Sequence, residues 1–279
     1  MTNFFSASSA DILGPAFIAG ILVLLSHVPL GRQVLRRGII FIDLAVAQAA
    51  ATGALLATLI LDSQTDGSAH ADLTSSFLTQ GFVTQVCAAA AALIMVTSLH
   101  QLEQRWPHIQ EALIGGSFVL LASTAILVSA KDPHGSEHMH DLMAGQILWA
   151  NSEQLIWLAA ASIASLFCMR IFSSPLLRFY IPFAIAITAA VQIVGVYLVF
   201  ACLIFPALSY RKESALHAII LATVTGASGF ILGLSASLLY DLPSGPTIVV
   251  ALALSCLCGN AANQLINKRS QAQTKHAAP

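Results

Sequence analysis

Long apolar stretches, separated by short polar segments, recur along the whole of this sequence. A helix needs about 20 mainly apolar residues to cross the hydrocarbon core of a bilayer. Most of the stretches have about this length, and together they predict a chain that crosses a membrane several times. The predicted spans are Ile12–Val28, Gly38–Leu61, Phe82–Leu99, Ala112–Ala130, Leu155–Phe172, Phe179–Tyr210, Ala215–Leu239 and Pro246–Ile266.

Composition supports this interpretation. Of the 279 residues, 57% are hydrophobic and only 9% are charged, whereas soluble domains carry about 25% charged residues. The net charge of −1 gives no sign of nucleic-acid binding. The sequence therefore predicts an all-α, polytopic helical bundle with about eight or nine transmembrane segments. We expect one transmembrane permease domain over residues 1–267, in contact with membrane lipid, and a short cytoplasmic polar tail over residues 268–279.

Basic residues give the orientation, because cytoplasmic loops are enriched in Lys and Arg. Arg36 and Arg37 follow the first span, so that loop is predicted to be cytoplasmic. The next loop, Asp62–Gln80, contains no Lys or Arg and is predicted to lie outside. Lys268 and Arg269 leave the tail inside. We expect a multi-pass protein of the cell (inner) membrane with its N-terminus outside and its C-terminus in the cytoplasm.

The stretch Phe179–Tyr210 does not fit a simple span. Arg178 precedes it and Arg211 follows it, so both of its ends look cytoplasmic. As one helix it would run roughly 46 Å, against a hydrocarbon core of ~30 Å, and it is too short for two full spans. Breaks are available at Pro182, Gly195 and Pro206. We predict a broken or re-entrant segment that lines the substrate path; the alternative is one long tilted helix beside a misassigned loop.

Two polar residues of the second span are candidates for the substrate path. Asp43 is an acid flanked by apolar residues, and Gln48 lies deeper in the same helix. A charge inside a membrane is costly and often functional. The alternative for Asp43 is a structural ion pair with Arg36 or Arg37 just inside the cytoplasmic boundary.

The predicted outer loop Lys131–Ser152 concentrates histidines and acids. Imidazole and carboxylate groups together suit Zn²⁺ and similar metals. The alternative is a loop that is simply polar. The candidate capture site on the outer side consists of His134, Glu137, His138, His140 and Asp141.

No phosphate-binding loop, HExxH sequence or nucleophile elbow is present. The sequence therefore predicts a transport subunit that is not an enzyme and holds no permanent cofactor. A divalent metal, zinc first, is expected as its transported substrate, because imidazole suits zinc better than manganese. If ATP drives transport, another subunit must hydrolyse it.

Three groups of motifs run in order along the chain and resemble the zinc/manganese/iron ABC transporter permease family. They are His27–Gly31 with Arg36–Phe41 and Gln48–Gly53; Glu111–Gly115 with Asp141–Leu148; and Val194–Val199 with Ile204–Ala207 and Tyr240–Pro246. The resemblance implies a homodimeric helical permease, a cytoplasmic ATP-binding subunit and an extracytoplasmic metal-binding receptor protein.

The chain is a divergent member by this comparison. The family associates an Asp and a His of the first group with the metal path. Aligned on Gly53, Gln48 takes the position of that His, and Asp43 lies one residue before the Asp position. The family also carries a cytoplasmic helical segment before its long sixth region, where this chain has only Phe172–Phe179.

The predicted function is the membrane-spanning permease subunit of an ABC-type importer of divalent metal ions. The alternative is a stand-alone secondary transporter or facilitator that keeps the permease fold without an ATPase, and the short Phe172–Phe179 segment favours it. A membrane scaffold or metal sensor without transport is the third hypothesis, in which the outer histidines act as the receptor.

Overall fold

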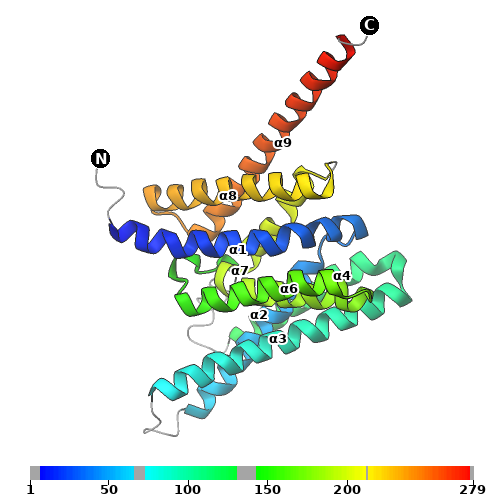
Figure 1. The fold of residues 1–279 in the computed structure, drawn as a ribbon. Coiled ribbons are helices and arrows are strands. Elements are labelled where there is room, and N and C mark those ends of the chain that lie inside the picture. The colour runs from blue at the N-terminus through cyan, green and yellow to red at the C-terminus, as the bar shows by residue number, and fades with distance from the viewer. Residues whose placement is uncertain (1–6, 66–72, 131–142, 212, 277–279) are drawn as a thin grey trace.

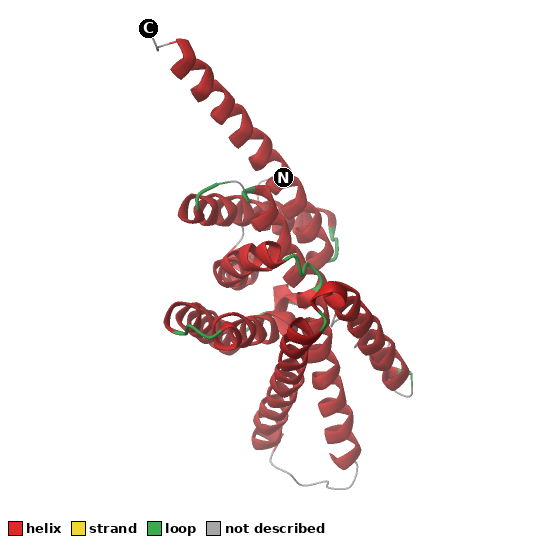
Figure 2. Cartoon of the chain, turned by 90° about the vertical axis from the view of Figure 1, so that its right-hand side faces the viewer, coloured by secondary structure: helices red, strands yellow, loops and turns green. Residues whose placement is uncertain are grey.

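The computed structural model describes residues 7–65, 73–130, 143–211 and 213–276, and within them all regular structure is helical (Figures 1 and 2). The elements are α1 (Ala7–Arg37), α2 (Ile42–Thr65), α3 (Leu73–Arg105), η1 (Pro107–Ile109), α4 (Gln110–Ser129), η2 (Ile147–Trp149), α6 (Ser152–Ile171), η3 (Leu176–Tyr180), α7 (Ile181–Ser209), α8 (Ala215–Tyr240) and α9 (Ser244–His276). The predicted all-α bundle is confirmed.

In the described part of the chain, 8 helical segments are long and apolar enough to cross a membrane. Each coincides with one predicted span, although the helices of the first and third spans extend several residues further. The chain is therefore a multi-pass membrane protein. Its outer helices expose large apolar side chains such as Leu127 of α4 (72%) and Ile163 of α6 (67%), which lipid accepts and water would not.

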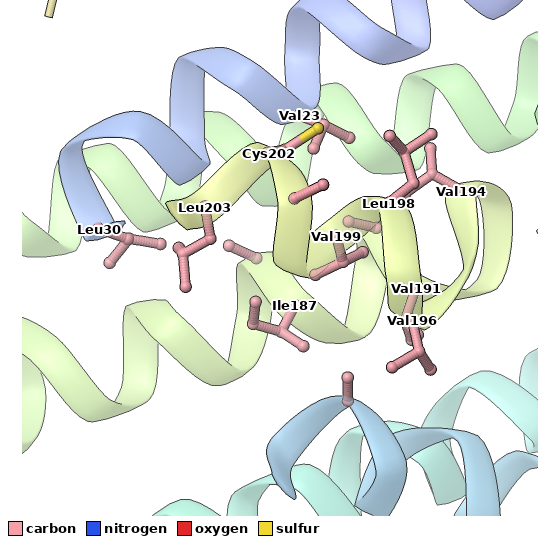
Figure 3. Packing of buried hydrophobic residues seen from close by; sticks show 14 of the residues in the cluster. Val23, Leu30, Ile187, Val191, Val194, Val196, Leu198, Val199, Cys202 and Leu203 are labelled. Atoms are coloured by element: carbon pink, nitrogen blue, oxygen red, sulfur yellow. The ribbon is translucent and has the colours of Figure 1, made fainter. Parts of the chain in front are cut away.

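The segment Leu176–Ser209 forms the centre of the bundle. Of the 18 most apolar consecutive residues of this segment, 78% are buried inside the bundle, against 17% for the spans that contain α4 and α6. Its aliphatic side chains, among them Ile187 and Val199, pack on one another and on α1 (Figure 3). A segment enclosed in this way by protein can carry irregular backbone and polar groups that lipid would not tolerate.

The predicted break in this segment is confirmed, and it lies at Gly195. Gly195 has φ 78° and ψ 165°, a conformation that is essentially reserved for glycine. Pro182 instead occupies the first turn of α7, and Pro206 lies inside a helix that continues through it. Of the three predicted breaking residues, only Gly195 breaks the helix. Pro182 does not break it, because proline fits the first turn without loss of a hydrogen bond.

The chain reverses direction at Gly195. The residues just before and just after α7 both contact the same end of α1: Arg37 lies 4.3 Å from the ring centroid of Phe179, and Arg32 Nη1 donates to the Tyr210 carbonyl at 3.2 Å. The tip instead meets the segment after α4, where Gln146 N donates to Ile193 O at 3.1 Å. Residues 181–209 therefore form a re-entrant hairpin with a first half-helix (181–194) and a second half-helix (196–209). The alternative of one long tilted helix is wrong.

Candidate substrate path

Asp43 lies in the first turn of α2 and is fully buried. No described side chain donates a hydrogen bond to either of its carboxylate oxygens. Arg37 pairs with Glu103 at 3.2 Å instead, and Arg36 is exposed. The structural ion pair considered for Asp43 is therefore wrong, because the nearby arginine has a partner on α3. A buried acid without a partner side chain is the arrangement expected of a functional group.

Gln48 lies about 9 Å from the start of α2 at ~1.5 Å per residue. It is 1% exposed, and both atoms of its side-chain amide lack a hydrogen-bond partner. Thr52, one turn further on, donates to the backbone carbonyl of Gln48 at 2.7 Å and not to its side chain. Each buried polar group left in this state costs about 1–3 kcal/mol. α2 thus carries two buried polar side chains without side-chain partners, Asp43 and Gln48, about 140° apart around the helix.

The first half-helix also carries buried polar groups without hydrogen-bond partners. Thr188 and Gln192 are one turn apart and share a helical face. The Thr188 hydroxyl and the Gln192 side-chain nitrogen are both buried without a partner. α2 packs directly against α7. Because both helices start at the end where Arg37 lies, Gln48 and Thr188 lie at similar depths, about 9 and 11 Å from their helix starts.

His27 is a candidate that the sequence analysis did not single out for the path. It is fully buried, and its Nδ1 lies 2.9 Å from the Val23 carbonyl oxygen. A carbonyl can only accept, so the ring proton is assigned to Nδ1, and Nε2 presents a lone pair with no partner. His27 follows Val23 by four residues and precedes Leu30 by three, and both of these pack beside α7 in Figure 3.

The signal for His27 was present in the sequence, since it lies about 15 Å before Arg37 along the first span and therefore near mid-membrane. The hydrogen bond of its ring is the stronger sign, because histidines that bind metals usually donate their other ring N–H to a carbonyl or carboxylate.

These groups do not form a closed metal site. Among the described residues, no group of three or more His, Cys, Asp and Glu side chains could hold a metal ion. The predicted capture residues His134, Glu137, His138, His140 and Asp141 lie outside the described residues. The described interior offers separate single groups of ligand type, the Asp43 carboxylate on α2 and the His27 imidazole on α1.

Comparison with known proteins gives two findings. Residues 176–262 match the model of the ABC 3 transport family, and this segment contains the hairpin and α8. A chain in the solved structure of PsaBC from Streptococcus pneumoniae in complex with Fab has the same fold, with a TM-score of 0.69 and 19% identity. That alignment covers 91% of this chain and 94% of the other. No curated protein matches the chain. The match of residues 176–262 to the ABC 3 transport family confirms the predicted resemblance over that segment, and the solved structure shows that the fold is shared.

Proposed function

We propose that the chain is the membrane-spanning permease subunit of an ABC-type importer of divalent metal ions, with zinc as its substrate. The observation that carries this proposal is the re-entrant hairpin enclosed by the bundle, with unpartnered polar groups on it and on the neighbouring α2. Irregular backbone and unpartnered polar groups at membrane depth are typical of a substrate path. The family match falls on the same segment.

Within this function, Asp43 and His27 supply charge and an imidazole nitrogen to the passing metal, and Gln48 supplies a neutral amide oxygen. Imidazole favours zinc over manganese, which prefers oxygen ligands. Because the described interior lacks a closed chelate, the ion would leave each ligand easily. Transport needs binding that is strong enough to admit the ion and weak enough to release it.

The proposed assembly is a homodimer in the inner membrane, with a cytoplasmic ATP-binding subunit and an outer metal-binding receptor. The N-terminus lies outside and the tail inside in this arrangement. One observation favours the stand-alone transporter as the second candidate: α6 ends at Ile171 and η3 begins at Leu176, so only residues 172–175 link them. A separate helix for docking on an ATPase does not fit in that link.

Purification of the tagged chain from membranes separates the two candidates. We expect an ATP-binding subunit to co-purify, with ATP hydrolysis that rises when a zinc-loaded receptor protein is added. A chain that purifies alone and moves zinc into ATP-free liposomes would overturn the importer proposal and establish the stand-alone transporter.

The outer loop offers a second test. Replacing His134, His138 and His140 by alanine together should raise the zinc concentration needed for half-maximal uptake about tenfold or more, because loss of roughly 1.4 kcal/mol of binding changes affinity tenfold. The maximal rate should stay unchanged, since in the proposed function the ion meets these residues before it enters the membrane path. Uptake kinetics measured with ⁶⁵Zn in intact cells would show both constants. An unchanged half-maximal concentration would identify the loop as simply polar.

A further inference from the structure

Two arginines of α1 hold the two ends of the hairpin in different ways. Arg32 is 9% exposed, and its guanidinium donates to two backbone carbonyls that follow the second half-helix: Tyr210 O at 3.2 Å and Glu213 O at 3.3 Å. Arg37, about one and a half turns further along α1, lies over the aromatic rings that precede the first half-helix. The centroids of Phe179 and Tyr180 are 4.3 and 5.6 Å from its guanidinium carbon.

The second half-helix is fixed to α1 along its length as well as at its end. Gly31 of α1 lies so close to α7 that an added Cβ would overlap the carbonyl of Leu203, with the Leu203 carbonyl carbon at 2.9 Å and the Ala207 Cβ at 3.1 Å. Backbones in such contact cannot slide or separate without loss of extensive packing. The second half-helix and α1 therefore behave as one rigid body.

The first half-helix is held at its start by polar contacts from two helices. Ser165 Oγ of α6 donates to the Pro182 carbonyl at 3.0 Å, and α3 supplies the others. Tyr180 Oη donates to Glu103 Oε2 at 2.5 Å, and Arg37 Nη1 pairs with Glu103 Oε1 at 3.2 Å. One carboxylate of α3 thus joins α1 to the foot of the first half-helix. We call Arg37, Glu103 and Tyr180 the latch. The Arg37 and Glu103 side chains are 28% and 31% exposed, so water or a partner can compete for them.

The foot itself has unusual backbone. Leu176–Tyr180 is a turn of π-helix, a form that is rare and found mostly at functional sites. At the other end of the first half-helix lies Gly195, whose positive φ marks the reversal of the chain. The first half-helix therefore lies between two irregular points, although its side chains, among them Phe183 and Ile187, are as buried as those of the second half-helix. It is also the half that carries Thr188 and Gln192, whose buried polar atoms lack partners.

We propose that the first half-helix is the moving element of the path, that it pivots at Gly195 and that the latch holds it in the state seen here. Opening the latch moves Thr188 and Gln192 relative to α2 and gives these groups new partners, water or the passing ion. This inference rests on the proposed function, because alternating access in a transporter requires an element that moves beside the substrate path.

The test measures exposure directly and requires neither ATP nor metal. In a background with Cys87, Cys168, Cys256 and Cys258 replaced by alanine, native Cys202 reports on the second half-helix. Thr188→Cys, made with Cys202→Ala, reports on the first. Both positions are buried here, at 0% and 3% exposure. The probe is N-ethylmaleimide, applied to the protein in membranes, and the readout is the rate of thiol labelling.

Tyr180→Phe removes only the hydroxyl of the latch. We expect it to raise labelling at position 188 about tenfold, the effect of losing one hydrogen bond to a charged group, and to leave Cys202 unchanged. Tyr210→Phe removes the same single oxygen from the residue that follows the fixed half-helix and should change neither rate. Equal acceleration at both positions would mean general loosening, and no acceleration at 188 would mean that no latch operates. Either result overturns the proposal, whether or not an ATP-binding subunit co-purifies.

Discussion

Replacing Gly195 by alanine is expected to prevent the chain from accumulating as folded protein. The φ of 78° is strained for any residue with a Cβ, and residues held in such regions cost about 1–3 kcal/mol. A Cβ would also lie 2.7 Å from the Ala144 carbonyl carbon and 2.8 Å from Gly145 Cα, which is backbone and cannot turn aside. The backbone strain and the steric overlap together would remove a large share of the total folding stability, which is about 5–15 kcal/mol for a typical protein.

The same loss of folded protein is expected when alanine replaces either of the two other glycines at this contact, Gly145 and Gly245. Gly145 has φ 73°, and a Cβ there would lie 2.6 Å from Gly195 N and overlap the Val194 carbonyl. At Gly245 a Cβ would overlap the Ala144 carbonyl oxygen. Three segments far apart in sequence thus meet through backbone contact, and alanine at any of the three should destabilise the protein by more than about 3 kcal/mol.

Gly116→Ala on α4 is the matched control. A Cβ there meets nothing within 4 Å, and alanine in a helix is about 1 kcal/mol better than glycine. The yield of monodisperse protein in detergent and the midpoint of thermal unfolding would be measured for all four variants. Gly195→Ala with the unfolding midpoint of the unchanged chain would contradict the described reversal at this residue.

Replacing Asp43 by asparagine is expected to lower metal uptake by about 100-fold or more while the protein stays as stable as before, or becomes more so. A buried carboxylate without a partner side chain costs folding free energy, so its neutral isostere removes that cost. The metal loses the anionic ligand that offsets its own charge in the membrane, and loss of about 2.7 kcal/mol of attraction is a factor of 100.

Asp241→Asn provides the comparison for this change. Asp241 ends α8 in a left-handed conformation that asparagine also adopts readily, and it is exposed, so uptake and stability should both stay unchanged. Zinc uptake and thermal unfolding would be followed on the same preparations. Uptake that survives Asp43→Asn, or falls only in step with the amount of folded protein, would remove Asp43 from the path.

Sequence patterns were sufficient for the features that depend on local chemistry. Apolar length gave the spans, and the basic residues on both sides of Phe179–Tyr210 required a chain that returns to its own side. Sequence patterns could not show that Gly195 alone makes the reversal, since the reversal depends on contact with Gly145, 50 positions earlier in the sequence. For the same reason Arg37 was considered a partner of nearby Asp43, whereas its partner Glu103 lies on α3, 66 residues away.

His27 shows a second limit. A histidine in an apolar span is visible in the sequence, but whether its ring nitrogens have partners depends on the rotamer and on the helices around it. Only the three-dimensional arrangement shows that Nδ1 lies within hydrogen-bond distance of the Val23 carbonyl and that Nε2 has no hydrogen-bond partner.

The re-entrant hairpin also determines whether the chain crosses the membrane an even or an odd number of times. Eight segments are long and apolar enough to cross a membrane, and an even number of crossings would return the two ends of the described chain to one side. The hairpin enters and leaves on the same side, so it contributes no crossing, and the remaining segments give an odd number. We therefore predict that the start of α1 and the end of α9 face opposite compartments, and that α8 and α9 point the opposite way from an assignment made by counting apolar helices. Reporter fusions after Tyr210 and after Tyr240 should therefore report opposite compartments, with the first on the same side as Arg37.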